Sequence, residues 1–584
     1  MATQPQGDAF HIYDTTLRDG AQQEGLNLSV HDKMTIAKHL DDLGVGFIEG
    51  GWPGANPRDT EFFARVAKEM KFKNAQFVAF GATRRPNVKA ADDEQVRALL
   101  DSQAPIITVV AKSHDRHVDL ALKTSLDENL AMVRETIALL VKEGRRVFLD
   151  AEHFFDGYKA NPQYALACAK AAYDSGARWV VLCDTNGGTL PHEIEKIVAE
   201  VVKIVPGNHV GVHCHDDTGQ AVANSLAALR AGARQIQGTL NGLGERCGNA
   251  NLTTIIPNLL LKEEFASRFE IGVSREKLAH LTRISHALDE LLNRAPNRHA
   301  PYVGASAFAT KAGIHASAVL TDPRTYEHVP PESVGNMRRV LVSDQAGRSN
   351  LISELTRLGV AFDKDDPRLT RILEEVKEKE AQGYAYEGAD ASLYLLAKRI
   401  LGETPAFFDV ERYSVAVDRR FGRNGGIEDR GAEAIVKIHV GGESRISAAE
   451  GNGPVNALDL ALRKDLGAYQ RFIEDVRLVD YRVRVFQGGT DAVTRVLVEC
   501  ADDAGLRWST VGVSANVIDA SFEALVDAIN DFEGAVVVVS HDLRLIAQIA
   551  EEIWLVDKGQ CRKFPGDIAD YKEHVQHEIT RMEA

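Results

Sequence analysis

Two histidines separated by one residue are the clearest sign of chemistry in the sequence. His213 and His215 flank Cys214 at the end of an apolar run, 209–215, that is typical of a β-strand. Because side chains alternate between the two faces of a strand, both imidazoles point to one side and Cys214 points away. Two imidazoles on one face form a two-nitrogen platform for a metal ion. The alternative is a histidine pair that ends a strand without a metal.

An arginine and an aspartate stand side by side after another apolar run. Residues 11–16 are followed by Arg18 and Asp19 in the stretch Asp-Thr-Thr-Leu-Arg-Asp-Gly. A fixed cation can stabilise an oxyanion, and a carboxylate is an oxygen ligand that divalent metals favour. A structural ion pair between the two side chains is the alternative.

Carboxylates and an amide follow two further runs. Asp150 and Glu152 share one strand face, so both look into the same site, where they can bind a ligand or relay a proton. A strand end that meets solvent is the alternative. Asn249 lies in the glycine-rich stretch 242–251 and offers an amide oxygen to a metal, although glycine spacing by itself is weak evidence. His315, far downstream, is a lone histidine and carries little weight alone.

The segments that carry these residues alternate in a regular way. Within the first 250 residues, short apolar runs typical of strands are separated by amphipathic stretches typical of helices. Eight strands spaced by helices predict an α/β fold, a (β/α)8 TIM barrel. A doubly wound open sheet is the alternative, but no run is followed by the Gly-x-Gly-x-x-Gly turn of that fold. The runs are 11–16, 47–51, 76–81, 106–112, 146–153, 179–185, 209–215 and 235–240.

Polar side chains gather at the carboxyl ends of these runs. In a barrel such ends meet at one mouth, where this fold places its chemistry. Strand ends also meet loops, which explains part of the pattern. The residues in question are Asp14, Glu49, Lys112, Glu152, Asp184, His213 and Asn241.

The rest of the chain predicts further domains. After a catalytic barrel over 1–273, residues 274–406 have a mostly helical pattern and predict helical linker subdomains. Residues 407–530 alternate strands and helices between glycine-rich turns, which is typical of an α+β domain. The pattern changes once more in a fourth block, 531–584.

Composition excludes several classes of function. The 584 residues suit three or four domains, and 68 Lys and Arg against 84 Asp and Glu give a formal net charge of −16. This acidic balance, without a long basic run, argues against a nucleic-acid partner. We see no secretory signal, and no apolar run approaches the ~20 residues of a membrane helix. Six scattered cysteines argue against a disulfide framework, so we expect a cytoplasmic protein without a membrane partner.

Taken together, the motifs resemble one family of enzymes. Four motifs are similar, in this order, to those of the metal-dependent acyl-CoA Claisen-condensing barrels. They are Asp14-Thr-Thr-Leu-Arg-Asp-Gly, Glu152, His213-x-His215 and the Gly-Leu-Gly-Glu-Arg-x-Gly-Asn stretch ending at Asn249. That family includes the isopropylmalate, homocitrate and citramalate synthases, with the hydroxymethylglutaryl-CoA lyases as relatives. The resemblance covers residues 8–530, and the stretches that begin at Glu49 and Asp150 are most similar to the citramalate synthases.

This resemblance implies an acyltransferase. It would condense acetyl-CoA with a small 2-keto acid, pyruvate, and with water to give citramalate and CoA for isoleucine synthesis. The alternative is 2-ketoisovalerate as substrate, the reaction of the isopropylmalate synthases, because a hydrophobic pocket separates one methylene by only ~1–3 kcal/mol. A metal-binding scaffold that has lost catalysis is a further alternative.

The resemblance also implies a divalent metal and its ligands. Asp19, His213 and His215 would bind the metal, with Asn249 as a fourth or more distant ligand. The mixed oxygen and nitrogen set suits Mg²⁺ or Mn²⁺, and Zn²⁺ is compatible with it. Arg18 would stabilise the enolate or the developing alkoxide.

Further roles are implied for residues outside the metal set. Thr185 would contact the keto-acid carboxylate, and Glu152 would help to activate acetyl-CoA. His315 would be the downstream general acid or base, with Tyr326 as its neighbour. Residues from 410 to 530 would form a regulatory domain that binds an end-product amino acid, isoleucine, between the subunits of a homodimer.

The last block resembles a different family. From Ala535 onward, the sequence is similar to the end of an ATP-binding cassette ATPase of the F subfamily. The similar stretches are the valine run 536–539, Ser-His541-Asp and the later Trp-Leu-Val-Asp-Lys-Gly. No P-loop or signature motif accompanies them, so we assign no ATPase function to His541. A chimeric fusion is the interpretation we prefer. An appended partner-binding module is one alternative, and a nucleotide-binding or translation-associated protein is another.

Overall fold

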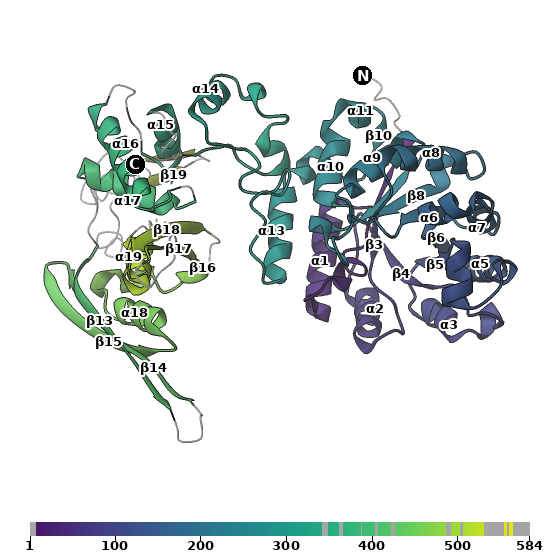
Figure 1. Cartoon of the computed structure of the whole chain (residues 1–584), viewed down its shortest axis with the longest axis horizontal. Coiled ribbons are helices and arrows are strands. Elements are labelled where there is room, and N and C mark those ends of the chain that lie inside the picture. Colours follow the sequence, from purple (N-terminus) through teal and green to yellow (C-terminus); the bar gives the residue numbers. More distant parts are fainter. Residues whose placement is uncertain are drawn as a thin grey trace, which may run out of the picture. The chain divides into compact units, whose positions relative to one another are not determined.

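The structure, a computed structural model, divides into two compact units, Met1–Arg357 and Leu358–Ala584. Their division falls inside the segment 274–406 for which the sequence predicts helical linkers. Figure 1 shows the elements of both units. The structure describes residues 8–341, 348–360, 362, 366–386, 388–402, 407–421, 427–485, 492–502, 506–530, 554–557 and 560–563.

The first unit is built around a closed ring of eight parallel strands. β2 pairs in parallel with both β3 and β9, and the latter pairing closes the barrel. The eight predicted runs correspond to these eight strands, so the predicted TIM barrel is confirmed. The strands are β2 (His11–Asp14), β3 (Phe47–Glu49), β4 (Gln76–Ala82), β5 (Ile106–Lys112), β6 (Arg146–Glu152), β7 (Trp179–Asp184), β8 (Val210–Cys214) and β9 (Gln235–Gly238).

Helices surround the strand ring (Figure 1). The amphipathic stretches 30–43 and 126–142 of the sequence predict α1 and α5 with their observed bounds. Ser29 begins α1 with a capping box completed by Asp32. The sequence pattern predicts no helix at α3, which is short, or at α10, which is mostly apolar and contains Pro257. The helices are α1 (Val30–Leu43), α2 (Pro57–Glu69), α3 (Glu94–Asp101), α5 (Leu126–Lys142), α7 (Pro162–Asp174), α8 (Pro191–Val201), α9 (Ala221–Arg230) and α10 (Leu252–Leu261). Between strands and helices lie the short α4 (Asp115–His117) and α6 (Phe154–Ala160).

A cluster of aromatic and aliphatic side chains fills the inside of the barrel. Phe47 on β3 meets Phe148 on β6 with ring centroids 5.2 Å apart, although these strands are not neighbours in the sheet. Tyr13 on β2 also meets Phe148. The contacts therefore cross the interior, which is a packed core, as this fold requires. The buried cluster comprises Tyr13, Phe47, Val78, Ile106, Phe148, Trp179 and Val181.

Elements that follow the barrel in sequence pack on its outer core. Leu281 and Ile284 of α13 belong to the same buried cluster as the barrel helices, and Asn241 at the barrel mouth donates a hydrogen bond to the Ser285 carbonyl. β1 (Asp8–Ala9) pairs in parallel with β10 (Phe269–Glu270). The remaining elements of this unit are α11 (Glu263–Ala266), α12 (Arg275–Leu278), α13 (Leu281–Leu291), β11 (Ala309–Thr310), α14 (Gly313–Thr321), β12 (Arg339–Val340) and α15 (Arg348–Arg357).

The second unit contains two three-stranded antiparallel sheets, β13-β14-β15 and β16-β17-β18. α18 packs on the first sheet and α19 on the second, around a shared core that includes Leu458 and Leu525. The predicted α+β character is confirmed. The strand-like runs 434–441, 481–486 and 495–500 of the sequence predict β14, β16 and β17, whereas β13, β15 and β18 have no predicted counterpart. The elements are α16 (Pro367–Ala381), α17 (Asp390–Leu401), β13 (Asp409–Phe421), β14 (Ile427–Val440), β15 (Glu443–Gly451), α18 (Pro454–Arg463), β16 (Arg477–Val485), β17 (Thr494–Ala501), β18 (Arg507–Ser514) and α19 (Val517–Asn530).

Only two short strands of the last block are described. β19 (Trp554–Asp557) and β20 (Gln560–Lys563) pair as an antiparallel hairpin. His541 and the valine run 536–539 lie outside the described residues.

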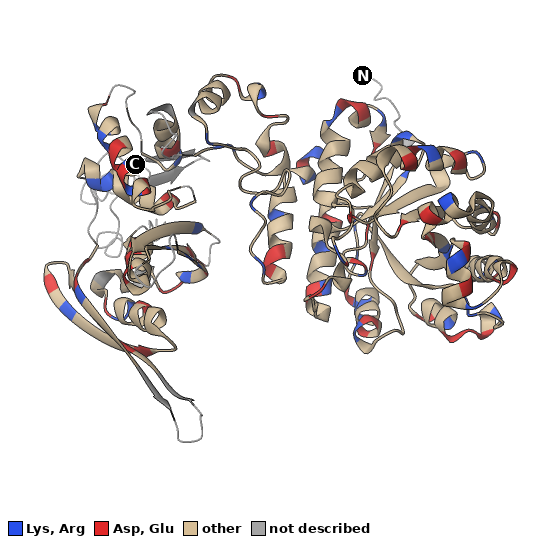
Figure 2. Ribbon diagram, viewed as in Figure 1, with Lys and Arg blue, Asp and Glu red and all other residues tan. Residues whose placement is uncertain are grey.

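Charged residues of both signs are interspersed along the outer helices (Figure 2). Among the described helices, none combines the length and the apolar composition that a bilayer crossing demands.

Candidate active site

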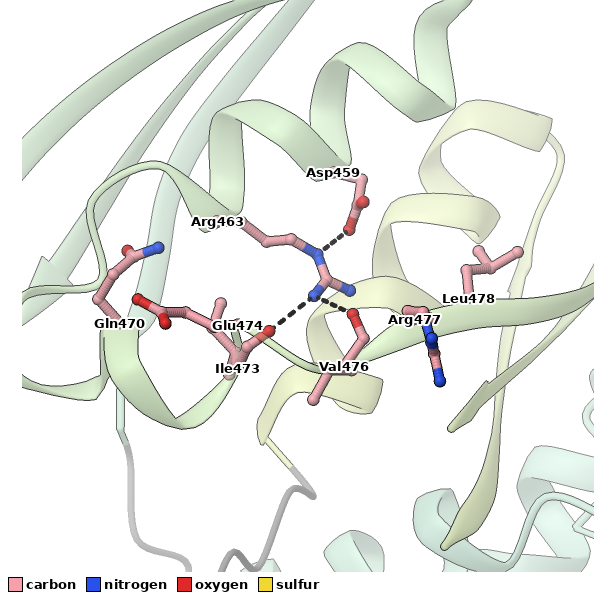
Figure 3. A pocket seen from close by; sticks show the side chains of 8 residues that line it. All are labelled: Asp459, Arg463, Gln470, Ile473, Glu474, Val476, Arg477 and Leu478. Carbon is pink, nitrogen blue, oxygen red and sulfur yellow. Dashed lines mark hydrogen bonds and ion pairs between the residues drawn. The ribbon is translucent and has the colours of Figure 1, made fainter. Parts of the chain in front are cut away.

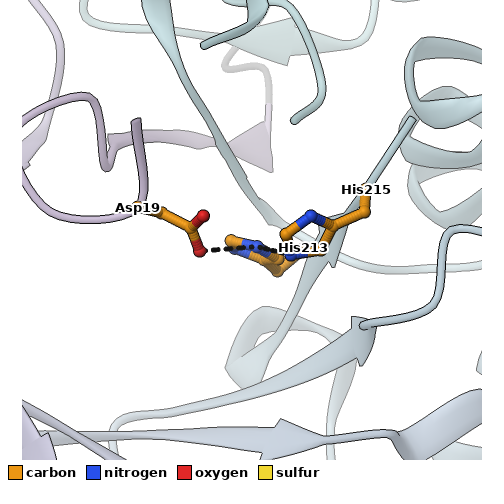
Figure 4. Close-up of side chains that lie close together, drawn as sticks. All are labelled: Asp19, His213 and His215. Carbon is orange, nitrogen blue, oxygen red and sulfur yellow. Dashed lines mark hydrogen bonds and ion pairs between the residues drawn. The ribbon is translucent and has the colours of Figure 1, made fainter. Parts of the chain in front are cut away.

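Three side chains that the sequence singles out as metal ligands meet at the barrel mouth. Asp19 lies in the loop after β2, His213 near the end of β8, and His215 just beyond that strand. Asp19 faces the two imidazoles (Figure 4). His213 Nε2 lies 3.4 Å from His215 Nε2 and 3.5 Å from Asp19 Oδ2, and one ligand atom from each residue falls within 4.8 Å of the others. The predicted shared face of the two histidines is therefore observed.

Burial keeps both imidazoles neutral and therefore able to bind a cation. It is the largest cause of the lowered pKa of His213, and Arg18 adds to the effect. Burial and the neighbouring His213 lower the pKa of His215 to about 4. Burial alone would raise the pKa of Asp19, but the adjacent Arg18 guanidinium outweighs it and lowers that pKa, so this carboxylate is ionised.

The Arg18 guanidinium is fixed from several sides. Its Nε donates to Glu49 Oε2 at 2.7 Å, and its Nη1 donates to Asp19 Oδ2 at 2.8 Å. The Phe80 ring lies below it, 3.9 Å from the guanidinium carbon. Asp150 Oδ2 is 3.9 Å from Nη2. Burial opposes the charge of Arg18, but Glu49 and Asp19 outweigh it and raise its pKa, so the cation is permanent and already oriented.

The carboxylates around Arg18 outnumber it. Glu49 is fully buried and accepts hydrogen bonds from the Tyr13 hydroxyl and the Thr15 hydroxyl, both at 2.5 Å. Burial, together with the charge of Glu49, raises the pKa of Asp150 to about 8. Three carboxyl groups therefore surround one guanidinium, an arrangement that favours a further cation, such as a divalent metal ion, beside them.

Asn249 reaches the same cluster through its amide nitrogen. Nδ2 donates to Asp19 Oδ1 and to the Leu243 carbonyl, both at 3.0 Å. Its amide oxygen is buried and has no hydrogen-bond partner among the described residues. A buried acceptor without a partner is unusual. The residue thus orients Asp19 and retains an oxygen for another ligand.

The residues present fit a divalent metal. A carboxylate oxygen and two neutral imidazole nitrogens are a donor set that such ions accept. The surplus of carboxyl groups over cations and the unpartnered oxygen of Asn249 favour the same ligand class. Asp19, His213 and His215 would hold the ion.

Glu152 and Thr185 lie at the rim of the mouth. Glu152 forms an ion pair with Lys112, and its Oε1 is 3.9 Å from His153 Nε2. Asp150 and Glu152 do share a strand face, but Asp150 faces Arg18, whereas Glu152 pairs with Lys112 at the edge. The Thr185 hydroxyl accepts a hydrogen bond from the His153 backbone at 2.8 Å, where His153 adopts a left-handed conformation with φ of 57°.

His315 and Tyr326 are close to each other but exposed. Their ring centroids are 4.5 Å apart, and Tyr326 is 53% exposed. Within the described residues, neither side chain forms a hydrogen bond or an ion pair with the barrel. The structure therefore pairs these two residues and does not bring them to the metal ligands.

Sequence reasoning missed three side chains of this site. Glu49 was noted as a strand-end polar residue without a role, and Phe80 and Gln237 were not noted at all. Phe80 is an ordinary apolar strand residue, and Gln237 is a polar residue inside a strand, where it accepts a hydrogen bond from His213 Nδ1 at 2.9 Å. Only the alternation of Gln235 and Gln237 along this strand, which places both side chains on one face, could have drawn attention to it.

Three family models match successive parts of the chain. The HMGL-like model matches residues 9–284, the homocitrate synthase post-HMGL domain-like model residues 302–383, and the LeuA allosteric (dimerisation) domain model residues 387–533. The chain is 53% identical to the (R)-citramalate synthase of Streptomyces coelicolor over 531 residues, which are 90% of this chain and 97% of that protein. The chain belongs to the (R)-citramalate synthase family. The resemblance predicted for residues 8–530 is confirmed.

Further proteins are similar to this chain. The (R)-citramalate synthase of Aquifex aeolicus is 50% identical over 89% of this chain and 97% of its own length. Among solved structures, the HMG-CoA lyase of Bacillus subtilis is 21% identical, with a TM-score of 0.43 and coverage of 50% of this chain and 96% of that chain.

Removing one imidazole tests the metal site. We expect His215→Ala to weaken Mn²⁺ binding by more than about 100-fold, because even the loss of a hydrogen-bond partner of a metal ligand costs about 10–100-fold. Isothermal titration of the purified chain with Mn²⁺ measures the affinity. His192→Ala, on the exposed face of α8, is the matched control and should bind as the unaltered chain does. Equal affinity of the His215 variant would remove this residue from the ligand set.

Proposed function

We propose that this enzyme condenses acetyl-CoA with pyruvate and water to give (R)-citramalate and CoA. The observation that carries the proposal is the 53% identity to a protein named (R)-citramalate synthase over 97% of that protein. The cluster of Asp19, His213 and His215 beside Arg18 supports it, because the reaction needs a polarised carbonyl next to a fixed cation.

The keto acid would bind between the metal ligands and Arg18. A bound divalent metal supplies Lewis-acid polarisation of the keto carbonyl. Mg²⁺ or Mn²⁺ suits the mixed ligand set, and Zn²⁺ is compatible with it. Thr185, at the rim, would contact the keto-acid carboxylate. Arg18 is already oriented by Glu49 and Asp19, so it can stabilise negative charge on oxygen without reorganising.

Carbon–carbon bond formation would follow removal of a methyl proton from acetyl-CoA. Glu152 would help to activate acetyl-CoA, and its ion pair with Lys112 supports this role by holding the carboxylate at the rim. The enolate carbon attacks the keto carbon, and water then cleaves the thioester to release CoA. His315, beside Tyr326, would act as the general acid or base.

The alternative substrate is 2-ketoisovalerate. A probable 2-isopropylmalate synthase of Methanopyrus kandleri is 33% identical over 90% of this chain, a more distant relationship than that to the citramalate synthases.

A panel of 2-keto acids tests the substrate. We expect pyruvate to be turned over at least about 10-fold faster than 2-ketoisovalerate, measured by thiol release from acetyl-CoA and by identification of citramalate. Because the chain would accept both through the same carboxylate and carbonyl, only the alkyl group separates them. Faster turnover of 2-ketoisovalerate would overturn the choice of pyruvate.

Replacing the fixed cation tests the mechanism. Arg18→Ala should lower kcat by about 10²–10³-fold, the usual loss for one oxyanion-stabilising donor. Mn²⁺ binding should persist, because all three ligand side chains remain. Arg65→Ala, on the solvent side of α2, is the control. Unchanged turnover of the Arg18 variant would refute its role, and loss of Mn²⁺ binding would assign Arg18 to holding the site together.

Regulation is proposed for the second unit. Residues 387–533 match a family described as an allosteric (dimerisation) domain, which supports a homodimer regulated by an amino acid, isoleucine. A pocket of about 400 Å³ lies beside α18, and Figure 3 shows Arg463 at its centre, held by Asp459. Arginines 463 and 477 suit a carboxylate, Asp459 and Glu474 suit an ammonium group, and Ile473, Val476 and Leu478 suit an aliphatic side chain.

Loss of one carboxylate at this pocket tests the effector site. Glu474→Ala should raise the isoleucine concentration for half-inhibition about 10-fold, because an ion pair with the ligand's ammonium group is lost. Thiol-release assays over a range of isoleucine concentrations measure the shift. Glu443→Ala, an exposed carboxylate in the same unit, is the control. An unchanged inhibition curve would place the effector elsewhere.

Residues 531–584 are still best interpreted as a chimeric fusion. The match to the LeuA domain ends at residue 533, and 531 residues align with the Streptomyces protein. These limits support the proposal that residues 531–584 are foreign to the condensing enzyme. The resemblance to a cassette ATPase and the cytoplasmic location remain predictions.

A further inference from the structure

A chain of buried hydrogen bonds ends on one metal ligand. His213 Nδ1 lies 2.9 Å from Gln237 Oε1, and Gln237 Nε2 donates to Asp150 Oδ1 at 3.0 Å. The three side chains come from β8, β9 and β6. All are buried: Gln237 is 0% exposed, Asp150 3% and His213 4%.

The carboxylate decides which way the amide faces. An amide has one donor end and one acceptor end. Gln237 Nε2 donates to Asp150 Oδ1, so the acceptor end of the amide faces His213. Arg18 Nη2 lies 3.9 Å from the other oxygen of Asp150, which leaves Oδ1 to accept from the amide.

The orientation of the amide decides where His213 carries its proton. A neutral imidazole has a single ring proton, and Gln237 Oε1 accepts it from Nδ1. Nε2 is then left with a lone pair, and it is this atom that faces Asp19 and His215. The opposite tautomer would place a proton on Nε2, where it would block binding of a cation.

We propose that Gln237 is a positioning residue that keeps the Nε2 lone pair of His213 available to the metal, and that Asp150 orients its amide. This inference rests on the proposed metal site. It gives a function to a strand-interior glutamine, which would otherwise be an uncommon polar residue inside a barrel.

A variant of similar size that cannot accept a hydrogen bond tests the proposal. Gln237→Met should raise the Kd for Mn²⁺ by about 10–100-fold, the usual effect of losing the partner of a ligating histidine. Isothermal titration of the purified full chain with MnCl₂ provides the readout, which does not depend on turnover. Gln235→Met is the matched control: it lies on the same strand and face, is also buried, and has no hydrogen-bond partner among the described residues. It should bind Mn²⁺ as the unaltered chain does.

An exchange of amide and carboxylate separates positioning from packing. In the double variant Gln237→Glu, Asp150→Asn, the new carboxylate accepts from His213 Nδ1 and from the new amide, so both hydrogen bonds are restored. We expect its Kd for Mn²⁺ to lie within about threefold of the original value, well below that of Gln237→Met.

The Mn²⁺ affinities of these variants distinguish failure of the inference about Gln237 from failure of the proposed metal site. Gln237→Met binding Mn²⁺ as tightly as the Gln235→Met control would overturn the inference while leaving the metal site intact. A double variant as weak as Gln237→Met would show that packing, and not the hydrogen-bond direction, matters, and would also overturn it. An unaltered chain that binds no Mn²⁺ would refute the proposed metal site and the inference with it.

Discussion

The ion pair between Arg18 and Glu49, deep in the barrel mouth, is the interaction on which the site depends. A fully buried carboxylate is stable only when it is paired and hydrogen-bonded, and Glu49 has Arg18 and two hydroxyl donors around it. The same guanidinium then binds Asp19 and lies near Asp150, so one cation organises carboxylates from three separate strands or strand ends.

In this arrangement, carboxyl groups outnumber cations at the barrel mouth. Three carboxyl groups around one guanidinium, next to imidazoles that burial keeps neutral, form a site that favours further positive charge. The raised pKa of Asp150 shows the same imbalance, because burial and Glu49 both disfavour another ionised group there. A divalent cation is the ligand class that corrects the imbalance. The arrangement also accounts for preorganisation, since Arg18 is aligned by its carboxylates before any substrate arrives.

The sequence predicts the parts of this site that depend on local spacing. Strand alternation predicts that His213 and His215 share a face, and the position of polar residues after apolar runs predicts the mouth to which Asp19 and Glu152 contribute. Contacts between strands distant in sequence are not encoded in any local pattern. Phe80 beneath Arg18 and Gln237 behind His213 depend on barrel closure, so they became visible only in the fold. Asp150 and Glu152 illustrate the same limit, because a shared face did not reveal that Arg18 and Lys112 would draw them to different partners.

The proposed substrate site at the barrel mouth and the proposed effector pocket beside α18 differ in the chemical group that distinguishes a keto acid from an amino acid. Both ligands carry a carboxylate and a short alkyl group, so cations and apolar side chains cannot separate them. At the barrel mouth a metal held by Asp19, His213 and His215 would exclude an ammonium group by charge and would favour a keto oxygen. The pocket beside α18 presents Asp459 and Glu474 instead, and these carboxylates suit an ammonium group and disfavour a keto oxygen. An enzyme that consumes a 2-keto acid and responds to an amino acid of similar carbon skeleton needs such a division, because a shared recognition chemistry would let the effector compete with the substrate.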